Sequence, residues 1–238
     1  MKLLDSESLE NVEHFVKNHA RDFELDFRLE SYSCKMIKTD KKEWQRNVTN
    51  KTEMKELQPL SPPEDSYFYS QFSNFSGGRL RHSSEVSHSG SDNDVADEPP
   101  VIVGTVSRRT LFSLVSVLNL SFADYDFTQT KSDRFTLASI SECLKNVEAK
   151  FLTAMPDYFG VKDQFWNAVD EEININESIL FSYIPDFADD PYTSCIWSFN
   201  YFFWNRQRKR VLFLSCRALG VDTMEQMSNE DGVWIGVN

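Results

Sequence analysis

The sequence predicts an α+β domain: an antiparallel β-sheet flanked by helices in an α/β/α-like sandwich, interrupted by a long disordered loop. Residues 196–204 and 210–216 are apolar segments separated by a short polar turn, and should pair as an antiparallel hairpin. Residues 107–122 and 139–155 carry apolar side chains at helical spacing. Over residues 58–104 the composition shifts to proline, glycine, serine and acidic residues. The segment before this loop is too short to fold alone, so we expect one interrupted domain.

The part of the chain before the loop should supply two helices and a long strand. Residues 6–18 predict a helix, because apolar residues recur at helical spacing: Leu9, Val12, Phe15 and Val16. Residues 24–36 alternate like a strand. Their apolar residues change parity near Glu30 and Ser31, which predicts a bulge or a strong twist at that point. Residues 41–56 should be helical.

The loop is unsuited to a packed core. Residues 58–104 hold five of the eight prolines and four of the eight glycines, and seven acidic residues against two basic ones. Such a segment buries too little apolar surface to offset the entropy of ordering it. The exception is the aromatic stretch at residues 67–75, which suggests either a docking peptide or a loosely collapsed patch.

Two serines in the loop lie in kinase motifs. Ser61 precedes Pro62, as proline-directed kinases require, and Arg79 and Arg81 precede Ser84 in the pattern of basic-directed kinases. A phosphate on either serine would add about −1.5 to −2 charges to an already acidic segment. We therefore expect Ser61 and Ser84 to be phosphorylation sites.

Three helices and a strand should follow the loop, before the hairpin. Ser107 and Ser139 are placed to cap the helices at residues 107–122 and 139–155, and Pro156 ends the second helix. A third helix is expected over residues 161–175. A strand is expected over residues 178–184, which leads towards the hairpin.

The hairpin combines aromatic and basic residues, which leaves three interpretations: a membrane hairpin, a nucleic-acid platform or an ordinary core hairpin. One face is strongly apolar, with Trp197, Phe199, Tyr201 and Phe203, and the other is mixed, which predicts helices on one side and partial cover on the other. No uncharged stretch reaches the length of a membrane span. A net charge of −12 disfavours binding to phosphates. The core hairpin is therefore favoured, with Trp166 also assigned to the core.

The sequence shows no catalytic or cofactor-binding motif. It lacks nucleotide-binding glycine motifs, a nucleophile elbow and paired metal-binding histidines, so we expect no cofactor, no metal and no enzyme activity. The four cysteines are scattered, as in a chain with reduced thiols, and the first residues do not form a secretory signal. The acidic run at residues 170–172 is interpreted as a solvated helix face or as a patch for a protein partner.

Several segments together resemble the eukaryotic Maf-type repressors of RNA polymerase III. Residues 1–4 resemble the start of that family, residues 30–36 its first long strand and residues 60–63 the edge of its linker. Three stretches are similar to its sequence boxes: DYDF from Asp124, WNAVDEEI from Trp166 and WSFNYFF from Trp197. The last two are long enough to be specific. The chain departs from the family at Ala123, where proline is usual.

The resemblance implies a non-enzymatic repressor that binds RNA polymerase III and its Brf–TBP initiation factor and blocks polymerase recruitment. It implies shuttling between nucleus and cytoplasm, controlled by nutrient-responsive kinases and a phosphatase acting on the linker. Neither sequence-specific DNA binding nor membrane binding is expected. The domain would comprise residues 1–57 and 105–221, with the linker at 58–104 and a short tail at 222–238.

Partner contacts are expected from exposed polar residues of the boxes: Asp124, Asp126, Asp170, Glu171 and Arg208. Ser61 corresponds to the family's linker phosphosite, whereas Ser84 rests on its local motif alone. Two alternatives remain. One is a phosphorylation-regulated adaptor with other partners. The other is a small-molecule-binding or enzymatic α+β domain with a carboxylate site near Asp170.

Overall fold

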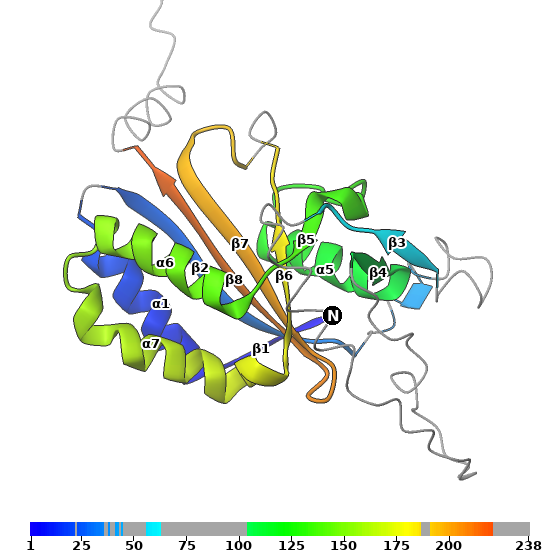
Figure 1. The fold of residues 1–238 in the computed structure, drawn as a ribbon, viewed down its shortest axis with the longest axis horizontal. Coiled ribbons are helices and arrows are strands. Elements are labelled where there is room, and N and C mark those ends of the chain that lie inside the picture. The colour runs from blue at the N-terminus through cyan, green and yellow to red at the C-terminus, as the bar shows by residue number, and fades with distance from the viewer. Residues whose placement is uncertain are drawn as a thin grey trace, which may run out of the picture.

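The computed structural model describes residues 1–21, 23–35, 38, 41–42, 44, 56–62, 104–186 and 191–220. Within these residues the chain forms the predicted α+β sandwich, in which one antiparallel sheet lies between two helical layers (Figure 1). Most of the expected helix at 41–56, the aromatic stretch at 67–75, Ser84 and the tail lie outside the described residues. No described helix has the length and hydrophobicity needed to cross a bilayer.

The main sheet has six strands in the order β1-β2-β8-β7-β6-β5, and every neighbouring pair is antiparallel. The predicted hairpin is confirmed and forms the centre of this sheet, with Asn205 opposite Arg210 at the turn. Strand bounds are Lys2–Leu4 (β1), Glu24–Ser33 (β2), Phe135–Leu137 (β5), Ile179–Tyr183 (β6), Cys195–Asn205 (β7) and Arg210–Leu219 (β8).

The helices begin close to where their capping residues predict. The Ser107 hydroxyl accepts the Thr110 N–H at 3.0 Å, and the Ser139 hydroxyl accepts the Glu142 N–H at 3.1 Å, so each satisfies a free donor of a first turn. The last helix begins three residues earlier than expected, because the fully buried Tyr158 belongs to it. Helix bounds are Glu7–His19 (α1), Arg108–Ser121 (α5), Ile140–Ala154 (α6) and Tyr158–Ile173 (α7), with short 3₁₀ turns at Ser132–Arg134 (η1) and Ile175–Glu177 (η2).

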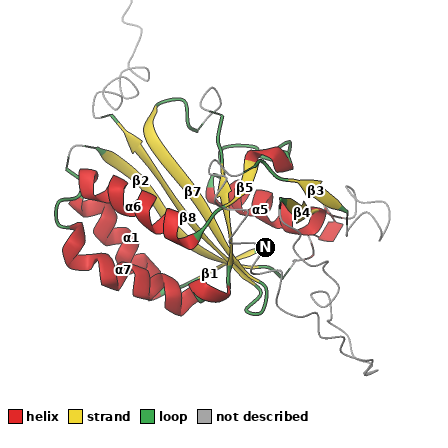
Figure 2. Ribbon diagram, viewed as in Figure 1, coloured by secondary structure: helices red, strands yellow, loops and turns green. Residues whose placement is uncertain are grey.

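Helices cover both faces of the sheet. Helices α1, α6 and α7 lie together on one face, and α5 lies on the other (Figures 1 and 2). Strand β7 therefore has two apolar faces: Phe199, Tyr201 and Phe203 pack towards the three helices, and Phe202 and Trp204 pack towards α5. The second face is covered more completely than the mixed sequence pattern predicts.

Two buried polar side chains on the α5 side of the hairpin, Asn200 and Ser215, are hydrogen-bonded to each other. Asn200 is 1% exposed, and its side-chain oxygen accepts hydrogen bonds from the Tyr192 hydroxyl and the Ser215 hydroxyl, each at 2.8 Å. A buried polar group without a partner destabilises the fold, and these two bonds offset that cost for the side-chain oxygen of Asn200, while its amide nitrogen is buried with no partner among the described residues. The alternation of polar and apolar residues therefore does not mark an open face.

Of the bulge or strong twist predicted near Glu30 and Ser31, the bulge is wrong. Strand β2 pairs with β8 in an unbroken register from Glu24 opposite Leu219 to Ser33 opposite Arg210. The apolar parity changes because each face of β2 meets a different core: Phe27 lies under the three helices, whereas Tyr32 lies on the α5 side. The strand also ends at Ser33, before Met36. The sheet has its register shift in β7 instead, between Cys195 and Trp197.

The end of α5 is held on the sheet by cationic side chains. Arg28 of β2 donates to the carbonyl of Ser121, at the last turn of α5, and its guanidinium carbon lies 4.6 Å from the centre of the Phe122 ring. Arg217 of β8 lies 5.3 Å from the same ring and pairs with Asp26. A cation is favourable beside the carbonyls of a helix C-terminus and over an aromatic face. These contacts orient α5 across the strands.

A second, two-stranded ribbon lies where the loop was expected to begin. Strands β3 (Leu57–Pro59) and β4 (Thr105–Ser107) are antiparallel, and Ser61 forms a bridge to Thr136 of β5. Residues 58–62 and 104, assigned to the loop from their composition, therefore belong to the folded part. The region between them, residues 63–103, lies outside the described residues.

An aromatic cluster centred on Phe151 ties α6 and α7 to the sheet. The Phe151 ring lies 5.3–5.8 Å from the rings of four neighbours, which are Phe27, Tyr158, Phe165 and Phe199. Such edge-to-face pairs add to the stabilisation from burial. Trp166 and Trp197, assigned to the core from sequence, pack at its margin and are only partly buried.

Replacing Phe151 with alanine should lower the free energy of unfolding by about 3–5 kcal/mol, because it opens a cavity inside this cluster. Trp197→Ala should cost less, about 1–2 kcal/mol, since a smaller part of its ring is removed from water. Urea unfolding followed by circular dichroism would measure both. A Trp197 variant as unstable as the Phe151 variant would contradict the assignment of Trp197 to the core margin.

Candidate protein-interaction surfaces

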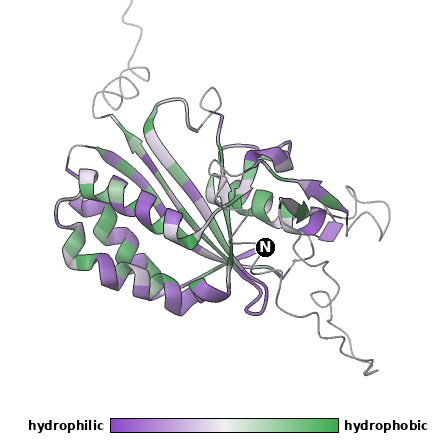
Figure 3. Ribbon diagram, viewed as in Figure 1, coloured by the Kyte–Doolittle hydropathy of each residue, from purple (hydrophilic) through white to green (hydrophobic). Residues whose placement is uncertain are grey.

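Three of the five predicted contact residues meet at one end of the molecule. Asp170 and Glu171 lie in the last turn of α7, and Arg208 lies in the β7–β8 turn. The Arg208 guanidinium donates to the backbone carbonyl of Glu171 at 2.6 Å. We call this region the hairpin end of the molecule. Its turn is strongly hydrophilic (Figure 3).

The basic run of the turn has a structural task at the hairpin end. The last carbonyls of a helix have no partner within the helix, and cations are favourable beside them. Arg208 and Asn205 both donate to such carbonyls of α7, the second to Ile173 at 2.8 Å. Arg210 forms an ion pair with Glu172 at 2.6 Å, and the Ser31 hydroxyl donates to the same carboxylate oxygen at 2.6 Å. Two of the arginines therefore fasten α7 to the sheet.

The acidic run of α7 divides into residues with different tasks. Asp170 is exposed, but its carboxylate accepts the backbone N–H of Ile175 at 2.8 Å and closes the turn around Asn174, which has a positive φ of 54°. Glu172 is held by Arg210 and Ser31. In the part of the chain that the structure describes, the Glu171 carboxylate is exposed and makes no hydrogen bond or ion pair. Glu171 is thus the member of the run that can reach a partner without disturbing the fold.

The other two predicted contact residues, Asp124 and Asp126, lie in the loop after α5. This loop is fixed from inside: Phe127 is buried, and its backbone N–H donates to the Asn119 side chain at 2.7 Å. Asp126 accepts the Thr128 N–H at 2.9 Å, and hydrogen bonds from Thr128 lower the pKa of the Asp126 carboxyl below its usual value. Asp124 is exposed. The loop therefore presents two carboxylates in a defined conformation.

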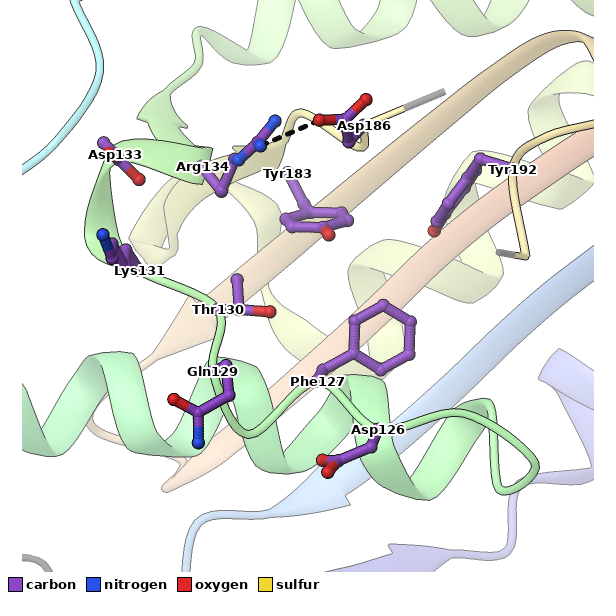
Figure 4. Close-up of a pocket in the computed structure, with 10 residues that line it drawn as sticks. All are labelled: Asp126, Phe127, Gln129, Thr130, Lys131, Asp133, Arg134, Tyr183, Asp186 and Tyr192. Atoms are coloured by element: carbon purple, nitrogen blue, oxygen red, sulfur yellow. Dashed lines mark hydrogen bonds and ion pairs between the residues drawn. The ribbon is translucent and has the colours of Figure 1, made fainter. Parts of the chain in front are cut away.

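A pocket of about 380 Å³ opens beside this loop (Figure 4). The rings of Phe127, Tyr183 and Tyr192 line it, and an ion pair of 3.1 Å joins Arg134 to Asp186 at its edge. The remaining lining side chains are polar and of mixed charge: Asp126, Gln129, Thr130, Lys131 and Asp133. The pocket could not be predicted from sequence, because its residues come from three separated segments. The nearby DYDF box was the only signal in the sequence.

The structure does not bring the two groups of predicted residues together. The hairpin end adjoins α7 on the three-helix face, whereas Asp124 and Asp126 lie on the α5 side of the sheet. Ser61 lies at a third place, beside β5, and Ser84 lies outside the described residues. Within the described residues, no three His, Cys, Asp or Glu side chains group to hold a metal ion. The arrangement offers separate polar surfaces for a macromolecular partner.

Comparison with known proteins identifies the family of the chain. A family model described as "Maf1 regulator" matches residues 25–215, which run from the second residue of β2 into β8 and include the three stretches DYDF, WNAVDEEI and WSFNYFF. The chain belongs to the Maf1 family. The resemblance drawn from the boxes is thereby confirmed, and the hairpin end and the DYDF loop of this Maf1 chain both lie inside the matched region.

Two curated relatives are named as repressors of RNA polymerase III transcription. The chain is 33% identical to a Dictyostelium discoideum protein over 132 residues, which cover 54% of this chain and 46% of that protein, named "Repressor of RNA polymerase III transcription". It is 28% identical to a Schizosaccharomyces pombe protein over 238 residues, covering 97% of this chain and 89% of that one, named "Repressor of RNA polymerase III transcription maf1". The alignment thus spans less than half of the first relative and most of the second.

A crystal structure has the same fold. The structure of citrus MAF1 aligns with 89% of this chain and 99% of that chain, with a TM-score of 0.57 and 22% identity. At this identity the likeness concerns the fold. It agrees with the two-sided sheet described above.

Glu172 and Glu171 are neighbouring glutamates that distinguish a structural role from a surface role. Glu172→Ala should lower the free energy of unfolding by about 1–3 kcal/mol, because Arg210 and Ser31 lose their acceptor. Glu171→Ala should change it by less than about 0.5 kcal/mol. Urea unfolding of both variants checks this difference, and equal effects would refute the assigned division of tasks.

Proposed function

We propose that this protein is a negative regulator of RNA polymerase III transcription. It binds the polymerase and its Brf–TBP initiation factor and blocks recruitment to promoters. The observation that supports this most is the family match over residues 25–215, together with relatives named as repressors of RNA polymerase III transcription. The described surfaces fit a protein partner: they are polar, separate from one another and built on rigid elements.

The charge of the free surface indicates the chemistry of the contact. At the hairpin end Arg210 and Ser31 hold Glu172, and Asp170 accepts the Ile175 N–H, so the Glu171 carboxylate is the acidic group of this run that remains for a partner. Glu171 and Asp124 are exposed carboxylates on two different surfaces. With a net charge of −12, the protein attracts basic regions of the transcription machinery and is steered away from bare DNA.

The proposed control is phosphorylation of the linker at Ser61 and Ser84. Nutrient-responsive kinases keep the protein inactive or cytoplasmic, and a phosphatase releases it to act in the nucleus. The motifs around the two serines support this proposal, as does the position of Ser61 at the boundary of the folded part.

Transcription of a tRNA gene by purified RNA polymerase III and its initiation factors tests the function. The unphosphorylated protein should reduce the transcript yield and should co-purify with the polymerase. A folded protein that neither represses nor binds would refute the proposal and favour an adaptor with other partners.

Charge reversal at the hairpin end gives a residue-level prediction. Glu171→Lys should weaken polymerase binding about tenfold, close to 1.4 kcal/mol, because an attractive charge becomes repulsive. Asp163→Lys, on the exposed side of the same helix about two turns earlier, is the matched control for total charge. Binding measured by surface plasmon resonance on immobilised polymerase decides the matter: equal losses in both variants would leave no specific role for Glu171.

A further inference from the structure

The linker does not leave the folded domain as two loose ends. Residues 56–61 and 104–108 form a closed structure, which we call the linker clasp. It comprises strands β3 and β4 with their flanking residues, and it is held by backbone bonds at both ends. The Arg108 N–H donates to the Glu56 carbonyl at 3.0 Å, and the Leu60 N–H donates to the Gly104 carbonyl at 2.8 Å.

Ser61 is attached to this clasp and to the main sheet. Its backbone N–H donates to the Phe135 carbonyl at 2.8 Å, which places it beside the edge strand β5. The preceding residue, Leu60, is 8% exposed and packs in the core on the α5 side. The backbone around Ser61 is therefore engaged on one side with Gly104 and on the other with Phe135.

From these contacts we infer that Ser61 can be phosphorylated only when the linker clasp opens. The inference rests on the proposed control by phosphorylation at Ser61. A protein kinase takes its acceptor serine and the residues on either side as an extended segment inside its cleft. Residues 59–61 cannot enter such a cleft while Leu60 is buried and Ser61 is bonded to β5. The kinase must bind the fraction of molecules in which this segment is released.

The chemical step then follows in the released segment. The Ser61 hydroxyl oxygen attacks the γ-phosphorus of ATP, the bond to the β-phosphate oxygen breaks, ADP leaves, and the hydroxyl proton passes to the catalytic aspartate of the kinase. The product carries about −1.5 to −2 charges. Because the Ser61 side chain is partly buried in the closed clasp, returning it there would remove this charge from water. The phosphate therefore holds the clasp open.

Opening of the linker clasp also affects the start of helix α5. Strand β4 runs directly into α5, and Ser107 is both the last residue of β4 and the capping residue of that helix. Release of β3 removes the Glu56 carbonyl from the N–H of Arg108, the first residue of α5, and takes Leu57 away from its position opposite Ser107. The clasp therefore couples the state of Ser61 to the start of α5.

A reversible cross-link tests the inference. Pro59 lies opposite Thr105, and this pair falls between the hydrogen-bonded pairs of the ribbon, where facing side chains are closest. The double variant Pro59→Cys/Thr105→Cys should form a disulfide that locks the clasp. The kinase for this assay is a proline-directed kinase, selected beforehand for its ability to phosphorylate a free peptide of residues 57–66. Phosphate incorporation at Ser61 is then followed by mass spectrometry in the oxidised and reduced forms of the same variant.

We expect the oxidised form to be phosphorylated at least tenfold more slowly than the reduced form, while the free native peptide reacts equally in both redox buffers. Equal rates for the two protein forms would overturn the inference. Neither rate depends on repression, so a failure here and a failure of the transcription assay are distinguishable.

A second variant tests the opposite direction. Leu60→Ala removes the buried anchor and should raise the rate at Ser61 at least threefold, after division by the rate of a peptide with the same substitution. Leu3→Ala, which truncates an exposed leucine on β1 at the far edge of the sheet, is the matched control and should leave the rate unchanged. An unchanged rate in the Leu60 variant would show that opening does not limit phosphorylation.

Discussion

Burial of the β7–β8 hairpin on both faces is the constraint around which the structure is arranged. Both strands lie in the middle of the sheet, with β2 on one side and β6 on the other, so neither has a free edge. Each face then needs its own apolar cover, since alternate side chains of a strand point to opposite sides. Helices α1, α6 and α7 supply one cover and α5 the other. The dense aromatic content of β7 is the consequence of serving two cores at once.

Four arginines of the described sheet and its hairpin turn hold helix ends in place. Arg28 and Arg217 hold the end of α5 on the sheet, and Arg208 and Arg210 hold the end of α7. Both helices are thus fixed at their C-terminal ends by cations from neighbouring strands. Two residues of the basic cluster therefore have a structural role, and among the acidic residues 170–172 Glu171 is the one whose carboxylate has no partner within the described residues.

The sequence was informative wherever a pattern extended over several residues. The hairpin and the two serine caps followed from periodicity and spacing, and the family followed from the long boxes. The three-residue strands β1, β3, β4 and β5 could not be predicted, because so few residues carry no periodicity and their pairing depends on distant segments. The parity change at Ser31 was misread for a related reason. A strand that contributes apolar side chains to a different core on each face has the same local pattern as a strand with a register shift. The separate tasks of Asp170, Glu171 and Glu172 also depend on partners far away along the chain.

The linker clasp also gives the chain a particular architecture. A hydrogen bond joins Leu60 to Gly104, although 43 residues separate them in the sequence. The two parts of the domain therefore meet directly where the insertion leaves and re-enters it. In chain order, residues 63–103 are an insertion between the two strands of this β3–β4 ribbon. The closure entropy of a flexible insertion grows by only about 0.6 kcal/mol for each doubling of its length. A tight turn joining β3 to β4 would preserve the same backbone pairing, so the core does not fix the length of this insertion.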